Sequence, residues 1–168
     1  NRLRLSDRSG PFSAWELCVV AKQKFLDYRR ESNTEARRHY QQALGIDPRL
    51  VRARAGIGWT HLEDYCFNWS GDPAASLAAA ESSAFDALRM DPRHYSALYL
   101  KSYTHLLRRD FDLAEAECEN ARSDNPNDPE LLLHQGYVVS CGGAAEKGLD
   151  SITAALAINP HHPNWYHF

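Results

Sequence analysis

The stretch Ala87-Leu88-Arg89-Met90-Asp91-Pro92 decides the fold, because its outline occurs three more times along the chain. In each copy an Asp-Pro or Asn-Pro dipeptide ends the stretch, and an alanine stands five residues before the proline. The four prolines are spaced 44, 34 and 34 residues apart. Another small residue stands twelve positions before each proline. The matching sets of small residues and proline are Ala36, Ala43 and Pro48; Ala80, Ala87 and Pro92; Ala114, Ala121 and Pro126; and Gly148, Ala155 and Pro160.

This repeat predicts an all-α protein built from pairs of helices. Proline cannot continue a helix, and it disfavours helical geometry at the residue before it, so each dipeptide marks a helix end. Small residues at fixed places, two turns apart, let neighbouring helices approach closely. A unit of 34 residues accommodates two helices of about 13 residues with short connections. No segment alternates polar and apolar residues between turn signals, so we expect no strands.

The sequence also indicates where several helices begin. Residues 32–35 (Ser-Asn-Thr-Glu) and 112–115 (Asp-Leu-Ala-Glu) match the capping-box pattern, which predicts helix starts at Ser32 and Asp112. Asp72-Pro73 and Asp128-Pro129 place proline where the first helical residue would be.

The repeat, with its 34-residue period and its fixed positions of small residues and proline, resembles the tetratricopeptide repeat (TPR) family. The resemblance covers about residues 15–168 and leaves residues 1–14 as an N-terminal extension or linker. It implies a right-handed superhelical solenoid of antiparallel helix pairs, with about four repeats and a truncated fifth. The first interval is ten residues too long, and the excess lies within residues 63–77. We therefore expect a longer first helix or an inserted loop in that unit.

Both ends of the chain suggest a piece of a longer protein. The first residue is Asn1, and Met90 is the single methionine. After Pro160, the proline spacing of Pro126 and Pro129 is repeated at Pro163, which predicts the start of a fifth unit. Trp165, Tyr166 and Phe168 would then expose apolar surface, which makes a homodimer of the isolated segment an expectation.

The first helix of each unit lines the inner, concave face of such a solenoid. Aligning the units by their prolines places an aromatic residue at the same inner position four times: Phe25, Trp59, Tyr103 and Tyr137. Aromatic rings bury much apolar area and orient a partner through their edges or polar tips. The alternative is that these rings pack between repeats or against other segments. The candidate partner-binding residues are Phe25, Tyr28, Trp59, Leu62, Tyr99, Tyr103, Leu106, Leu133 and Tyr137.

Composition and motifs argue against several other functions. The formal charge of −3 gives no general attraction to nucleic acid, and no apolar run approaches the ~18–20 residues that span a membrane. The histidines are scattered, and there is no phosphate-binding loop or nucleophile motif. We expect no catalytic residue, no metal site and no cofactor. Four widely spaced cysteines, interpreted as buried or partly buried thiols, favour a cytoplasmic location; they are Cys18, Cys66, Cys118 and Cys141.

A finer resemblance concerns the run Ile158-Asn159-Pro160-His161-His162-Pro163-Asn164-Trp165-Tyr166 and the insertion around Trp69. These features resemble TPR regions that follow class III adenylate cyclase or winged-helix regulator domains in some proteobacteria. The sequence thus predicts a scaffold that binds a peptide or protein partner and is not itself an enzyme. The alternative is a regulatory or self-association module of a larger signalling protein.

Overall fold

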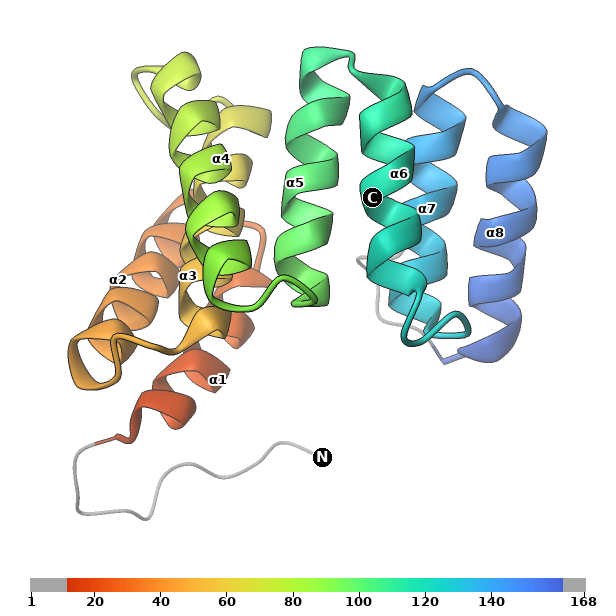
Figure 1. Ribbon diagram of the computed structural model, residues 1–168. Coiled ribbons are helices and arrows are strands. Elements are labelled where there is room, and N and C mark those ends of the chain that lie inside the picture. Colours follow the sequence, from red (N-terminus) through yellow and green to blue (C-terminus); the bar gives the residue numbers. More distant parts are fainter. Residues whose placement is uncertain (1–11, 162–168) are drawn as a thin grey trace.

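The computed structural model describes residues 12–161, and this part of the chain is all-helical. It contains eight α-helices and no strand (Figure 1), as the sequence predicts. Their bounds are α1 Ala14–Phe25, α2 Arg30–Ile46, α3 Val51–Cys66, α4 Pro73–Met90, α5 Tyr95–Arg108, α6 Phe111–Arg122, α7 Pro129–Cys141 and α8 Ala145–Ile158.

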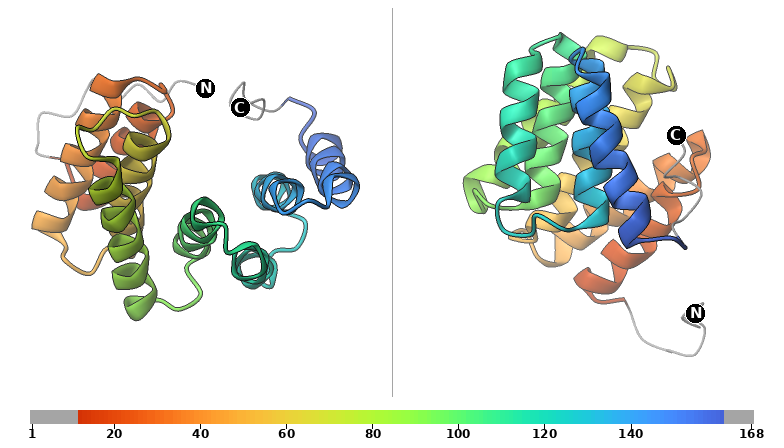
Figure 2. Two further views of the ribbon diagram at one scale, coloured as in Figure 1. Left: turned by 90° about the horizontal axis from the view of Figure 1, so that it is seen from above. Right: turned by 90° about the vertical axis from the view of Figure 1, so that its right-hand side faces the viewer.

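Consecutive helices pack as antiparallel pairs that follow one another along an arc. Seen from above (Figure 2, left), α5 and α7 lie on the inner side of this arc, and α6 and α8 lie on the outer side. Each pair also packs against the next, and α3 contacts both α1 and α5. The predicted solenoid of helix pairs is confirmed. We call the inner side of the arc the concave side.

The recurring small residues sit where the helices touch. All eight small residues of the repeat are buried, from Ala36 to Ala155. A methyl group added at Gly58 would lie 2.2 Å from Leu100 Cδ2, and one added at Gly136 would lie 2.7 Å from the carbonyl oxygen of Gly148. The close approach predicted from the small residues is therefore confirmed.

Three of the four proline dipeptides end a helix as predicted. Asp47, Asp91 and Asn159 are the residues that cap the C-termini of α2, α4 and α8. Helix α6 instead ends at Arg122, ahead of the Asn125-Pro126 dipeptide. The Ser123 hydroxyl donates to the carbonyl oxygen of Asn120 at 2.8 Å. Such a local side-chain bond competes with helical hydrogen bonding, which accounts for the earlier end.

Two of the four predicted helix starts are confirmed. The carboxylates of Asp72 and Asp128 cap α4 and α7, with Pro73 and Pro129 as the first helical residues. Both predicted capping boxes are wrong, because Ser32 and Asp112 lie within α2 and α6.

A capping box does begin α1, where the sequence pattern was not singled out. The Ser13 hydroxyl accepts from the backbone N–H of Glu16, and the Glu16 carboxylate accepts from the backbone N–H of Ser13 at 2.9 Å. The pattern alone cannot separate this case from the other two, because Thr34 and similar residues also bond within a helix turn.

The extra residues of the second unit are spread over both helices and their connection. Helix α3 has 16 residues against 14 in α5, and α4 has 18 against 12 in α6. The connection 67–72 is also longer than the two residues between α5 and α6. In this connection the rings of Phe67 and Trp69 stack with centroids 4.8 Å apart. Both expected causes of the longer interval are thus present.

The expected fifth unit and the apolar surface of Trp165, Tyr166 and Phe168 lie outside the described residues.

Candidate functional site on the concave side

Three inner helices bring aromatic side chains together on the concave side. Trp59 of α3 and Tyr103 of α5 meet edge to face, with ring centroids 5.5 Å apart. Tyr103 in turn stacks on Tyr137 of α7 at 5.5 Å, with only 18° between the ring planes. Such offset and edge contacts are the favoured arrangements of aromatic pairs. Together with His134, these residues form what we call the aromatic cluster.

His134 stands at the centre of this cluster, although the sequence marked it only as one of several scattered histidines. Its Nδ1 lies 3.0 Å from the hydroxyl of Tyr103, and its ring centroid lies 4.9 Å from that of Tyr99 and 6.0 Å from that of Trp59. Burial lowers the pKa of His134 to about 4, so the imidazole is neutral near pH 7. Its spacing from Tyr137, three residues on one helix, is the signal that could have placed it on the same face.

Hydrogen bonds hold Trp59 of the cluster and the adjacent ring of Tyr99 in place. The indole N–H of Trp59 donates to the carbonyl and hydroxyl oxygens of Ser96, at 3.1 and 3.0 Å. The hydroxyl of Tyr99 donates to the carbonyl oxygen of Leu131 at 2.9 Å. Trp59 and Tyr103 are half-buried, whereas 44% of Tyr137 is exposed. The cluster is therefore a fixed surface whose most accessible ring is Tyr137.

Three of the candidate residues belong to the core. Leu62 packs with Leu77 and Leu100, and Tyr99 and Leu106 lie in the cluster that includes Val138. All three are buried, so they support the surface from below and present little area to a partner.

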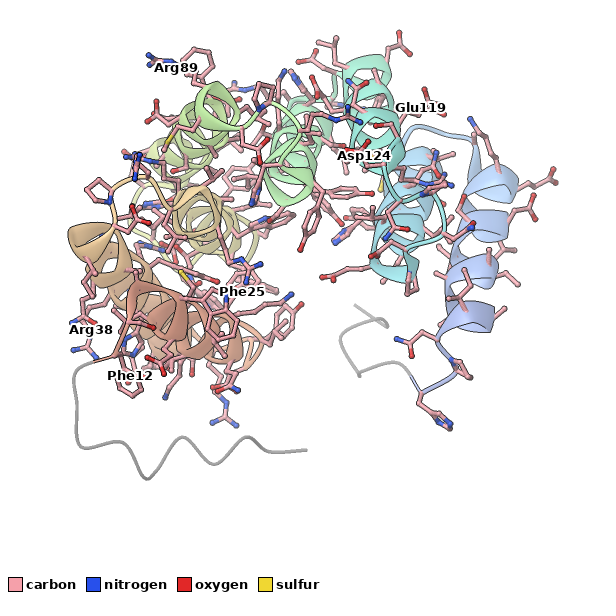
Figure 3. The ribbon with its side chains drawn as sticks, turned by 60° about the horizontal axis from the view of Figure 1, so that its bottom comes forward. Phe12, Phe25, Arg38, Arg89, Glu119 and Asp124 are labelled. Carbon is pink, nitrogen blue, oxygen red and sulfur yellow. The ribbon has the colours of Figure 1, made fainter. Side chains whose placement is uncertain are left out.

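The first unit departs from the alignment that placed Tyr28 on its inner helix. Helix α1 ends at Phe25, and Tyr28 lies in the following turn with a positive φ of 50°. Its ring lies 6.4 Å from that of Phe25 and 6.4 Å from that of Phe67, the latter edge to face. The helical placement of Tyr28 is wrong, because α1 has only 12 residues. Phe25 and Leu133 are half-buried on α1 and α7, and Figure 3 shows Phe25 on the inner side.

The ends of the arc approach each other across the concave side. Lys22 Nζ of α1 lies 3.9 Å from Glu130 Oε1 of α7, which links the first and fourth units. Both side chains are partly exposed, so this pair contributes little to stability on its own. The pair does show that α1 and α7 come close enough across the concave side for their side chains to meet.

A buried carboxylate, which the sequence did not single out, lies on the same side. Only 7% of Glu63 is exposed, and neither of its carboxylate oxygens has a hydrogen-bond partner among the described residues. Burial, with a smaller effect of the neighbouring Asp64 charge, raises the pKa of Glu63 to about 8. An uncompensated buried carboxylate is costly, so it is a candidate functional group.

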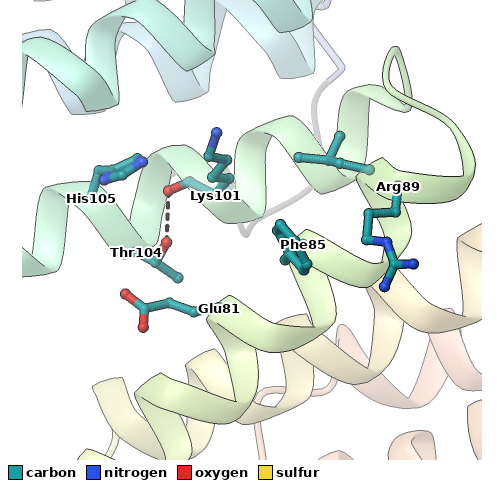
Figure 4. Close-up of a pocket in the computed structure, with 7 residues that line it drawn as sticks. Glu81, Phe85, Arg89, Lys101, Thr104 and His105 are labelled. Atoms are coloured by element: carbon teal, nitrogen blue, oxygen red, sulfur yellow. Dashed lines mark hydrogen bonds between the residues drawn. The ribbon is translucent and has the colours of Figure 1, made fainter.

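A second surface lies between α4 and α5, in a groove of about 400 Å³ (Figure 4). Phe85 is 64% exposed there, and the Arg89 guanidinium lies 5.9 Å from the centre of its ring. The residues that line the groove are Glu81, Phe85, Leu88, Arg89, Lys101, Thr104 and His105. On α5 they occupy a different face from Tyr99 and Tyr103, so this groove is separate from the aromatic cluster.

The described residues offer no metal centre: no group of three or more His, Cys, Asp or Glu side chains within 12–161 is arranged to hold an ion. Among these residues, no helix combines the length and apolar character of a membrane span. Cys18 and Cys118 are buried, but Cys66 and Cys141 are exposed at the ends of α3 and α7. The expectation of buried or partly buried thiols is therefore wrong for these two, which are the last residues of their helices.

Comparison with solved structures establishes the fold. TTC0263, a thermophilic TPR protein in Thermus thermophilus, superposes with a TM-score of 0.76 at 19% identity, over 90% of this chain and 76% of that one. MamA from Desulfovibrio magneticus RS-1 gives a TM-score of 0.56 at 19% identity, over 92% and 79% of the two chains. The chain thus has the fold of TPR proteins.

Sequence comparison adds a relative of much greater length. A putative adenylate cyclase 3 of Rhizobium meliloti (strain 1021) is 29% identical over 102 residues. The match covers 61% of this chain but only 17% of that protein. No family model matches the chain.

Proposed function

We propose that this chain is a protein-interaction module that binds an extended peptide segment of a partner protein on its concave side, without catalysis of its own. The observation that carries the proposal is the continuous stack from Trp59 through Tyr103 to Tyr137, contributed by three successive units. Phe25, Tyr28 and Leu133, which are half-buried, are further candidates for contact with the peptide.

The geometry suits recognition of apolar side chains in a peptide. A partner ring or aliphatic chain placed on Tyr137 would bury exposed aromatic area, and each buried aromatic side chain supplies on the order of 150–250 Å². Because the bonds to Ser96 already fix Trp59, little side-chain freedom is lost on binding. A backbone group of the peptide would find a hydrogen-bonding partner in the hydroxyl of the exposed Tyr137.

Selection from a random peptide library displayed on phage, with the purified chain as bait, tests this proposal. Peptides enriched on the wild type should bind at least ~10-fold more weakly to Tyr137→Ala, measured by fluorescence anisotropy, because a central aromatic contact contributes over ~1.4 kcal/mol. Phe85→Ala removes an even more exposed ring from the α4–α5 groove and serves as the matched control. Failure to enrich any sequence, or equal binding by Tyr137→Ala, would overturn the proposal.

The choice of Tyr137 follows from burial. Trp59 and Tyr103 pack against the core clusters of Leu62 and Leu106, so alanine at either place removes core contacts as well. Loss of binding by those variants would not separate recognition from packing.

A second candidate function is regulation of an attached catalytic or DNA-binding domain through self-association. The partial match to the putative adenylate cyclase favours it, and the cyclase activity would reside outside the TPR fold. The coding sequence on either side of residues 1–168 tests this candidate. A cyclase or winged-helix domain there supports it, and its absence rules it out.

A further inference from the structure

The groove between α4 and α5 has an apolar strip along α4. Glu81, Phe85 and Arg89 are four residues apart and Leu88 lies beside them, so these side chains share one face over two helical turns. Among the described residues, Phe85 is the most exposed large apolar side chain, and Leu88 is half-buried against the core. An apolar area that is both exposed and hollowed is typical of a surface that contacts another molecule.

Arg89 differs from the other charged side chains of the groove in having no ion-pair partner among the described residues. It is exposed, and its guanidinium lies 5.9 Å from the centre of the Phe85 ring, one turn away on α4 (Figure 4). A planar guanidinium with its fixed fork of N–H donors matches a carboxylate. The groove therefore favours a carboxylate that comes from another molecule.

The remaining polar side chains of the groove already have neighbours within the chain. They are Glu81, whose carboxylate accepts from Arg108 at 2.7 Å; Lys101, which donates to Glu117 at 2.6 Å; Thr104, which donates to the carbonyl oxygen of Lys101 at 2.7 Å; and His105, which lies 3.9 Å from Asp110. An extended peptide would bring backbone N–H and C=O groups against Phe85 and Leu88 with few hydrogen-bonding partners. A helix makes its backbone hydrogen bonds internally, so it suits this groove better.

We propose that the α4–α5 groove docks an amphipathic helix of a partner protein, which sets a large apolar side chain against Phe85 and Leu88 and an aspartate or glutamate, one turn away, against Arg89. The groove is separate from the aromatic cluster, so this inference goes beyond the proposed function. The spacing follows from α4, where Phe85 and Arg89 are one turn apart. A helix aligned with α4 presents residues three or four positions apart to both side chains.

Both contacts use groups that are already in place. The Phe85 ring supports the Arg89 guanidinium, so little side-chain freedom is lost when a carboxylate binds it. The apolar side chain of the partner covers the exposed ring and excludes water from the ion pair beside it. A basic helix would instead face the positive charges of Arg89 and Lys101. The groove thus discriminates in favour of acidic helices.

A library of helices tests this proposal. The helices are randomised on one face of a stable helical bundle, displayed on phage and selected on Tyr137→Ala, which weakens capture by the concave side. Enriched helices are measured by fluorescence anisotropy against wild type, Phe85→Ala, Arg89→Met and Arg38→Met. Arg38 is an exposed arginine of α2 outside the groove (Figure 3), so its variant removes the same charge elsewhere.

We expect the enriched helices to carry Asp or Glu three or four positions from a large apolar residue, and to bind Phe85→Ala at least ~10-fold more weakly than wild type. Replacing that acidic residue by its amide should weaken binding to wild type about 5-fold. The same replacement should leave binding to Arg89→Met unchanged, because the ion pair is already absent there. Arg38→Met should behave like wild type. Since Phe85 and Arg89 are exposed, both variants should keep the wild-type urea midpoint.

Enriched helices that bind Phe85→Ala as tightly as wild type would overturn the proposal, and so would an amide replacement that costs the same in Arg89→Met. The absence of any enriched helix would also overturn it. Sedimentation velocity at the assay concentration gives a separate check. A wild-type dimer that Phe85→Ala dissociates would mean that a second copy of the chain occupies the groove, against the proposal. None of these results bears on the concave side, which extended peptides and Tyr137→Ala test.

Discussion

Arg37 of α2 and Asp64 of α3 form a partly buried ion pair, with Arg37 Nη2 donating to Asp64 Oδ2 at 2.5 Å. The same guanidinium donates to the hydroxyl and carbonyl oxygens of Thr60, at 2.8 and 3.0 Å. Asn33 completes the network by donating to Asp64 Oδ1 and to the Thr60 carbonyl oxygen, each at 2.8 Å. These bonds join helix α2 of the first unit to helix α3 of the second.

Replacing Asp64 by alanine should lower the free energy of unfolding by about 2–3 kcal/mol, because Arg37 and Asn33 then lose a charged acceptor in a poorly hydrated place. Urea denaturation followed by circular dichroism measures this loss. Glu35→Ala is the matched control, since the Glu35–Lys24 pair is exposed to solvent and its loss should change stability much less. Equal losses in the two variants would contradict the importance of the network.

The contribution of Glu63 to the stability of the chain should fall between pH 5 and pH 8. The folded-state pKa of Glu63 is raised from 4.5 to about 8, so the folded chain holds a proton that the unfolded chain has released over this range. The contribution of Glu63 to stability is therefore greatest at the acid end and decreases as pH rises, by on the order of a few kcal/mol. His134 acts in the opposite direction below about pH 6.5, because its folded-state pKa is lowered to about 4. The fall in total stability is therefore clearest above pH 6.5.

Glu63→Gln should flatten this dependence, with little effect at pH 5 and a higher stability than wild type at pH 8.5. Urea midpoints of wild type and variant at pH 5, 6.5 and 8.5 measure the difference between them. Glu119→Gln, which changes an exposed glutamate of α6, should follow the wild type at each pH. A Glu63→Gln variant that is less stable than wild type at pH 8.5 would show that the Glu63 carboxylate makes a stabilising interaction, against this prediction.

Gly136→Ala should destabilise the chain by about 1–3 kcal/mol, even though alanine is the better helix former. The added methyl group would meet Ile152 Cγ1 at 2.5 Å and the backbone oxygen of Gly148 at 2.7 Å, and the backbone cannot move aside easily. Thermal denaturation checks the effect. Gly45 of α2 has nothing within 4 Å of such a methyl group, so Gly45→Ala should stabilise by about 0.5–1 kcal/mol.

Two of the four cysteines should react with a thiol reagent while the chain is folded. Cys66 and Cys141 are exposed, whereas Cys18 and Cys118 are buried. Burial also raises the pKa of Cys118 to about 11, despite its contact with Ser102 Oγ at 3.1 Å. Titration with Ellman's reagent should count two thiols before and four after denaturation; four fast thiols without denaturant would contradict the packing of α1 and α6.

Much of the fold is local and could be predicted from the chain alone. Proline ends a helix through its own ring and missing N–H, wherever it stands, so Pro48, Pro92 and Pro160 gave the helix ends without knowledge of any neighbour. The spacing of the small residues gave the pairing, because close packing of helices needs them at the contact. The exception was α6, where the side chain of Ser123 intervened.

The candidate site could be predicted only in outline. Its ring positions followed from the repeat, and Trp59, Tyr103 and Tyr137 do meet. The exposure of these rings could not be predicted from the repeat, because burial depends on neighbours far along the chain. The hydroxyl of Tyr99, for example, donates to the carbonyl oxygen of Leu131 on another helix. The role of His134 was missed for the same reason, since its contacts come from two other helices.

The sequence by itself determined an all-helical array of paired helices, because proline, helix caps and small residues act over a few positions and repeat in register. Only the tertiary structure decided which inner side chains remain accessible and where a charge is left without a partner. The curvature of the arc brings Lys22 to Glu130 and encloses Glu63 beside Tyr28, and curvature sums small rotations between units that no single stretch of sequence encodes.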